Sequence, residues 1–125
     1  MATIYDFAVD QGATKKLSLR YRYQDGVDGN GDPVYVGYPL AGCSARMQVR
    51  KAVGEPILAD LTTENGSITL EAGGEQGRID IVLSATQTSA LALRKAVYDL
   101  ELVYSSGEVV RLIQGKVYIS PNVTA

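Results

Sequence analysis

The side chains best suited to chemistry in this chain are oxygen ligands concentrated in the segment 24–33. They are Asp25, Asp28, Asn30 and Asp32. Residues 28–32 repeat the ligand alternation that opens an EF-hand calcium loop, but Pro33 replaces the glycine of that motif and Pro39 stands where its bidentate glutamate belongs. Aspartate and asparagine favour turns without any ion. The segment is therefore predicted to be an exposed, mobile loop, with calcium binding as the alternative.

Carboxylates elsewhere in the chain would have to act in pairs to catalyse acid–base chemistry such as glycoside hydrolysis. The candidates are Asp60, Glu64, Glu71, Asp80, Asp99 and Glu101. Each falls at a polar position of an expected strand or in a turn, which is the ordinary solvated arrangement. The chain has no histidine, which excludes imidazole-dependent triads and histidine-ligated metals, and it has no Ser-x-x-Lys arrangement. The sequence thus predicts a protein that is not an enzyme, with no catalytic residues, no cofactor and no small-molecule substrate.

Composition narrows the choice of partners. The 12 basic and 14 acidic residues give a formal net charge of −2 without a run of either sign, so a nucleic-acid partner is not expected. A membrane partner is not expected either, because no stretch approaches the roughly 20 apolar residues that a spanning helix needs. Cys43 is the only cysteine, which excludes an intrachain disulfide, and it is interpreted as a small buried apolar side chain.

Residues 96–121 are predicted to form a β-hairpin, which would be part of the scaffold that positions the candidate side chains. Tyr98, Leu100 and Leu102 share one face of the first arm of this hairpin, while Asp99 occupies the other. A period of two is typical of strands and would not segregate these side chains on a helix.

Further alternating segments predict a mostly β protein. Strands are expected over 4–9, 17–23, 34–38, 44–53, 57–62, 67–70 and 78–83. A short helix is expected after Ser84, which has capping-box spacing to Gln87, and should end near Ala92. Gly115 is a candidate bulge or close-packing point. We predict a single all-β domain over 1–125, a two-layer immunoglobulin-like β-sandwich of about eight or nine short strands with one short helix; a small open barrel is the alternative.

Tyrosine dominates the aromatic composition, with eight tyrosines, one phenylalanine and no tryptophan. One interpretation is that each ring is buried and leaves its hydroxyl at the edge of the domain. The other is a protein interface, where tyrosine is enriched, and Tyr35 and Tyr38 are the first candidates because they follow the glycine-rich segment.

Arginines provide the second pair of candidate interface residues, Arg46 and Arg50, which alternate on one expected strand. With Arg20 and Arg22 they would form a basic face if the two strands were neighbours. Such a face is usually solvated, and the functional alternative is a set of ion pairs between subunits.

Several sequence strings carry a resemblance to a known group of proteins. They are Ile4-Tyr5-Asp6-Phe7, Gln11-Gly12-Ala13-Thr14, Ala45-Arg46-Met47-Gln48-Val49-Arg50, Leu61-Thr62-Thr63-Glu64-Asn65-Gly66, Tyr98-Asp99-Leu100-Glu101-Leu102, Arg111-Leu112-Ile113-Gln114-Gly115-Lys116-Val117 and Ser120-Pro121. Together they resemble short bacteriophage structural proteins encoded among virion and tail genes, and distantly the N-terminal attachment domain of phage baseplate upper proteins. The resemblance covers nearly the whole chain, although the stretch 25–43 is longer and richer in glycine than the turn such proteins usually carry.

The resemblance implies a non-enzymatic virion component, present in multiple copies in the tail, baseplate or neck, which connects or anchors other tail components through protein–protein interfaces. Its expected partners are other phage structural proteins and copies of itself. It would be made in the host cytoplasm and located in the phage particle. The alternatives are a capsid decoration protein and a carbohydrate-binding receptor module; a wall-degrading enzyme is the least favoured.

Overall fold

The most strongly alternating segment of the chain forms the two longest strands of the structure. In the computed structural model, which describes residues 2–123, β10 (Lys95–Val103) and β11 (Val109–Ser120) pair antiparallel around a tight turn. Tyr98 and Leu100 are buried, while the side chains that alternate with them are partly covered. The predicted closing hairpin is therefore confirmed.

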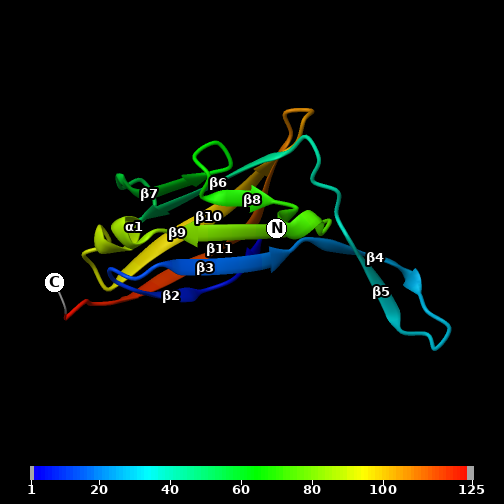
Figure 1. Ribbon diagram of the computed structural model, residues 1–125, viewed down its shortest axis with the longest axis horizontal. Helices are drawn as coiled ribbons and strands as arrows, with labels where there is room; N and C mark the ends of the chain where they lie inside the picture. Colours follow the sequence, from blue (N-terminus) through cyan, green and yellow to red (C-terminus); the bar gives the residue numbers. More distant parts are fainter. Residues whose placement is uncertain (1, 124–125) are drawn as a thin grey trace.

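This hairpin forms the centre of the six-stranded sheet, here called the large sheet (Figure 1). Its strand order is β1 (Thr3–Ile4), β11, β10, β6 (Ser44–Arg50) and β7 (Ile57–Thr62), and β2 (Phe7–Asp10) lies farther along the same edge of β11 as β1. Neighbouring strands are antiparallel except that β1 and β2 run parallel to β11.

A second, antiparallel sheet, here called the small sheet, covers one face of the large sheet. Its order is β3 (Lys15–Arg20), β9 (Arg78–Leu83) and β8 (Ile68–Leu70). A 3₁₀ turn, η1 (Ala72–Gly74), lies between β8 and β9. We call the two packed sheets the sandwich body.

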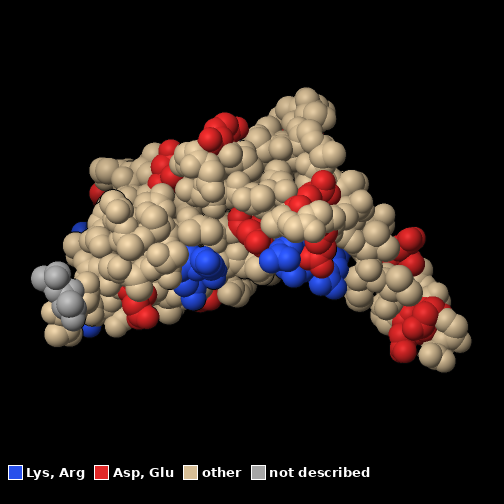
Figure 2. Space-filling model, viewed as in Figure 1, with Lys and Arg blue, Asp and Glu red and all other residues tan. Residues whose placement is uncertain are grey.

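The remaining two strands, β4 (Arg22–Val27) and β5 (Pro33–Gly37), form a separate antiparallel hairpin. We call this hairpin the arm. It projects away from one end of the sandwich body as a narrow extension (Figures 1 and 2).

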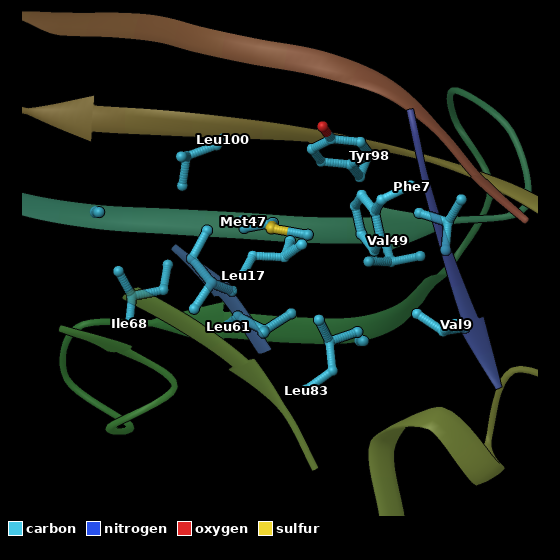
Figure 3. Packing of buried hydrophobic residues seen from close by; sticks show 14 of the residues in the cluster. Phe7, Val9, Leu17, Met47, Val49, Leu61, Ile68, Leu83, Tyr98 and Leu100 are labelled. Carbon is cyan, nitrogen blue, oxygen red and sulfur yellow. The ribbon is translucent and has the colours of Figure 1, made fainter. Parts of the chain in front are cut away.

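The core lies between the two sheets (Figure 3). Met47, Val49 and Leu100 of the large sheet face Leu17 and Ile68 of the small sheet. All five are buried, because inward positions recur at every second residue of each strand. The predicted all-β sandwich is confirmed.

The α-helix α1 (Ala85–Ser89) begins as the sequence predicts. The Ser84 hydroxyl accepts a hydrogen bond from the Gln87 N–H at 3.1 Å, and the Gln87 side chain accepts one from the Ser84 N–H at 2.8 Å. This reciprocal pair satisfies two amides that the helix itself leaves open. The helix ends at Ser89 rather than near Ala92, so the predicted length was too long.

The described residues form eleven strands rather than eight or nine, because two predicted strands are each divided. The segment 4–9 is interrupted after Ile4, where the chain passes so close to β11 that a side chain on Gly115 would collide with the Tyr5 carbonyl. Gly115 is thus a close-packing point, one of the two roles predicted for it.

The second division corrects the prediction of a long loop over 24–33. The strand predicted over 17–23 ends at Arg20, and a new strand continues to Val27 by pairing with β5. Its register shifts between Gln24 and Val27, where Gly26 adopts a φ of 74°. The glycine that signalled a loop therefore forms a bulge inside a hairpin.

Candidate functional site

The arm exposes apolar side chains on both of its strands. Every residue of β4 is exposed, as is β5 from Pro33 to Tyr35. Tyr35 is 58% exposed and Tyr23 is 44% exposed. A two-stranded hairpin is marginally stable in water by itself, so this one needs support from its attachment or from a partner.

One face of the arm carries a row of apolar side chains, here called the arm stripe, formed by Tyr23, Val34 and Val36. Tyr23 lies directly opposite Val36 in the ladder, and residues paired in this way share a face. Val34 shares that face because it is two positions from Val36. Tyr35 lies on the other face, opposite Gln24.

The tip of the arm is a turn organised by one carboxylate. Oδ1 of Asp28 accepts hydrogen bonds from the N–H groups of Asn30 at 2.8 Å and Asp32 at 3.0 Å. This is the Asx type of turn that the sequence predicts without an ion. Among residues 2–123, no group of three or more His, Cys, Asp or Glu side chains could hold a metal ion, and the calcium alternative gains no support from the geometry.

A cluster of tyrosines supports the arm at its attachment, and we call it the root cluster. The ring of Tyr38 stacks on Tyr21 with centroids 4.8 Å apart and meets the edge of Tyr23 at 5.9 Å. Tyr104, next to the end of β10, completes the cluster with its centroid 6.2 Å from that of Tyr38. Its hydroxyl lies 3.5 Å from that of Tyr21, and this hydrogen bond, with burial, raises the pKa of Tyr104.

Two glycines allow the backbone at the root of the arm to pass close to the backbone just before β9. A side chain on Gly37 would collide with the Gln76 carbonyl, and one on Gly77 would collide with the Tyr21 carbonyl. Gly77 also has a φ of +83°, which side chains rarely adopt. The Tyr21 N–H donates to the Gly77 carbonyl at 2.8 Å, so the contact is bonded as well as close. The arm is therefore held at a defined root.

The second candidate surface is an open hollow of about 830 Å³ on the outer face of the large sheet. Its lining includes three apolar side chains, those of Ile4, Val53 and Val97. The charged lining residues are three basic ones, Arg50, Arg111 and Lys116, and three acidic ones, Asp6, Asp99 and Glu101. Val53 follows the end of β6 and is 94% exposed.

Arg46 and Arg50 both point from β6 to this outer face but differ in their partners. Nε of Arg46 lies 2.8 Å from a carboxylate oxygen of Glu101 in an ion pair. Arg50 instead donates to the Glu55 carbonyl at 2.6 Å and to the side-chain oxygen of Gln48 at 2.8 Å. Within the described residues Arg50 has no ion pair, so its charge is not neutralised by a neighbouring carboxylate.

The basic face proposed from four arginines does not form. Arg20 lies on β3 of the small sheet and pairs with Glu75 at 2.9 Å, and Arg22 lies at the start of the arm. The strand of Arg46 and Arg50 is paired with β7 and β10, so it is no neighbour of β3. Strand adjacency in a sandwich depends on long-range pairing that alternation does not encode.

Four of the carboxylates considered for catalysis, Glu71, Asp80, Asp99 and Glu101, have structural partners. Asp80 lies 2.9 Å from Arg78, and this hydrogen-bonded ion pair holds the pKa of Asp80 below its usual value despite some burial. Asp99 lies 3.4 Å from Arg111, and Glu71 accepts from the Leu40 N–H at 3.3 Å. Cys43 is half-buried, and burial is the main cause of its raised pKa.

The structure divides the four predicted interface residues between two surfaces. Tyr35 lies on the arm and Tyr38 in its root cluster, whereas Arg46 and Arg50 lie on the outer face of the large sheet. Sequence reasoning did not select Val53 or the arm stripe. A weak signal was present, because a Val-Tyr-Val run beside an acidic, glycine-rich segment is apolar without an obvious place in the core.

Neither a scan against protein-family models nor a search of the curated proteins finds a match for this chain. Between residues 2 and 123, no helix combines the length and apolar character needed to cross a membrane.

Proposed function

We propose that this chain is a non-enzymatic structural subunit of a bacteriophage virion, present in multiple copies in the tail, baseplate or neck, and that it connects other components through protein–protein interfaces. The observation that carries the proposal is the arm, a hairpin with apolar side chains exposed on both faces. Surfaces of this kind mark interaction sites. The resemblance of the chain's sequence strings to short phage structural proteins supports the proposal that the subunit belongs to a bacteriophage virion.

The proposed mechanism is burial of the arm against a neighbouring protein. Tyr23 and Tyr35 are suitable anchors, because tyrosine provides a large contact area at a low cost in side-chain entropy. In a symmetric assembly each subunit repeats the contact, and a second engaged site binds at high effective concentration. Modest individual contacts would then give a durable structure.

The direct test is to locate the subunit by cryo-electron microscopy of the intact particle. We expect density for the sandwich body in the tail, baseplate or neck, with the arm buried against a neighbouring protein. Density on the capsid surface would favour a decoration protein instead. A particle without the subunit, or turnover of peptidoglycan or polysaccharide by the isolated chain, would contradict the proposal.

A carbohydrate-binding receptor module is the second candidate, and the hollow on the large sheet supports it. Its polar lining includes Gln48, Asp99 and Gln114, whose amide and carboxylate groups suit sugar hydroxyls. A glycan array distinguishes the two functions. Specific binding that is lost in Asp99→Ala and retained in an arm variant would favour the receptor module, while an array without binding would favour the structural subunit.

A further inference from the structure

Many of the exposed large apolar side chains lie at two separate places on this molecule. The arm carries Tyr23, Val27, Val34 and Tyr35. The hollow carries Ile4 and Val53. One surface is a narrow projection and the other is concave, so their shapes are suited to each other.

The charges that lack an ion pair are mainly of opposite sign on the two surfaces. The arm holds Asp25, Asp28 and Asp32, which take part in none of the ion pairs within residues 2–123. Figure 2 shows acidic atoms at the end of the arm. The hollow also has acidic lining residues, but Asp99 pairs with Arg111 and Glu101 with Arg46, which leaves Asp6 as the acidic lining residue without an ion pair among the described residues. Beside Val53, Arg50, Lys51 and Lys116 lack an ion pair within the same residues, so the unpaired charge there is mainly basic. Opposite charges without partners inside one chain favour contact between chains.

The fold separates the two surfaces so that one copy cannot join them. The arm continues from β3 at one end of the sandwich body, whereas the turn between β6 and β7, which contains Val53, lies at the other end (Figure 1). The root cluster and the close backbone contact at Gly77 hold the arm away from its own hollow. A contact between them therefore needs a second molecule.

We propose that copies of this chain associate head to tail, with the arm of one copy seated in the hollow of the next. Tyr23 and Tyr35 are the anchors, and the aspartates of the arm meet Arg50, Lys51 and Lys116 of the neighbour. This heterologous contact extends to a ring or a filament, depending on the rotation between copies. The inference deepens the proposed function, because it names the partner of the same arm.

The first test measures association of the full chain by sedimentation velocity at low salt. We expect the wild-type sedimentation coefficient to rise with concentration. The variant Tyr23→Ser/Tyr35→Ser and the variant Val53→Asp should each weaken association by about tenfold or more, which is typical for interface anchors. Val109→Ser is the matched control, since Val109 is an exposed β11 side chain outside both surfaces, and it should associate like the wild type. Circular dichroism and thermal melting establish that each variant is folded.

Mixing the two defective variants distinguishes a head-to-tail contact from a symmetric one. The arm variant keeps an intact hollow and the Val53→Asp variant keeps an intact arm. An equimolar mixture should therefore form a one-to-one complex and nothing larger. A symmetric arm-to-arm contact predicts instead that Val53→Asp associates with itself and that the mixture forms no new complex.

Added salt should weaken association, because at physiological ionic strength exposed charges more than about 8 Å apart are largely screened from each other. Asp25→Lys should weaken association, and Asp25→Lys mixed with Arg50→Asp should recover it. A wild-type chain that stays monomeric up to about 1 mM at low salt would overturn the inference. That result would leave the proposed function standing if imaging places the arm against a different virion protein.

Discussion

The sandwich body and the arm are both built from antiparallel strands, yet only the body buries side chains between them. Its two sheets enclose a continuous apolar cluster, whereas each strand of the arm is largely exposed. A hairpin of this kind contributes little burial to the fold that carries it. The stability of the fold therefore comes mainly from the body, while the apolar surface of the arm could be buried only by another molecule.

The root shows how one region depends on the other. Stacked tyrosines and a close glycine crossing join the arm to the small sheet, so the body sets the direction of the arm. Mutations should therefore separate into three classes: large effects in the core, intermediate effects at the root and small effects along the arm.

The largest expected effect comes from the core of the body. Leu100→Ala removes a fully buried side chain and should lower the free energy of unfolding by about 2–5 kcal/mol. The matched change on the arm, Val34→Ala, should cost no more than about 0.5 kcal/mol. Urea denaturation followed by circular dichroism measures both, and equal losses would break the distinction between body and arm.

An intermediate effect is expected at the root. Gly77→Ala introduces a side chain that collides with the Tyr21 carbonyl at a positive φ, which should cost about 1–3 kcal/mol. Gly31→Ala is the control, because Gly31 has a φ of +82° with open space around it. A smaller loss for Gly31→Ala, measured by thermal denaturation, would separate the collision from the backbone strain that the two changes share.

Alkaline pH should lower the stability of the sandwich body, and Tyr98 should be one cause. Burial raises the pKa of its phenol above the ordinary value of 10.0, and its hydroxyl donates to the Tyr5 carbonyl. Because the folded pKa is the higher one, this stabilisation is complete below about pH 10 and declines as the pH rises further, by up to about 1.4 kcal/mol per pH unit. Denaturation midpoints between neutral and strongly alkaline pH measure the decline, and Tyr98→Phe should make it shallower. An identical decline in that variant would exclude Tyr98 as its cause.

Small effects on stability, comparable with those along the arm, are expected on the outer face of the large sheet. Arg46→Ala removes an exposed ion pair with Glu101, and such pairs contribute about 0.2–1 kcal/mol. Arg50→Ala should change stability by a similarly small amount. Sedimentation should distinguish the two, since Arg50 lines the hollow and Arg46 does not. Equal losses of association in both variants would argue against the hollow as the docking surface.

Much of the fold could be predicted because its signals are local. The alternation around Tyr98 and Leu100 gave the closing hairpin, and the spacing from Ser84 to Gln87 gave the start of the helix. The division of the first predicted strand could not be predicted from local sequence, because it depends on the approach of Tyr5 to Gly115, which is far away in the chain.

The candidate site was predictable only in part. Tyrosine enrichment pointed to Tyr35, and strand alternation placed Arg46 and Arg50 on one face. Local sequence gave no way to know that the arm and the hollow lie at different ends of the molecule.

The sequence by itself determined most strands of the sandwich body, the side chains of those strands that face inward and the exclusion of histidine-dependent catalytic sites, because periodicity and residue chemistry act at short range. Only the tertiary structure decided that the residues from Arg22 to Gly37 leave the sandwich as an arm and that Arg50 and Val53 flank a hollow. The physical reason is that strand pairing and sheet packing join residues distant in the chain. Period-two alternation is the same whether a strand lies in a core or projects into solvent.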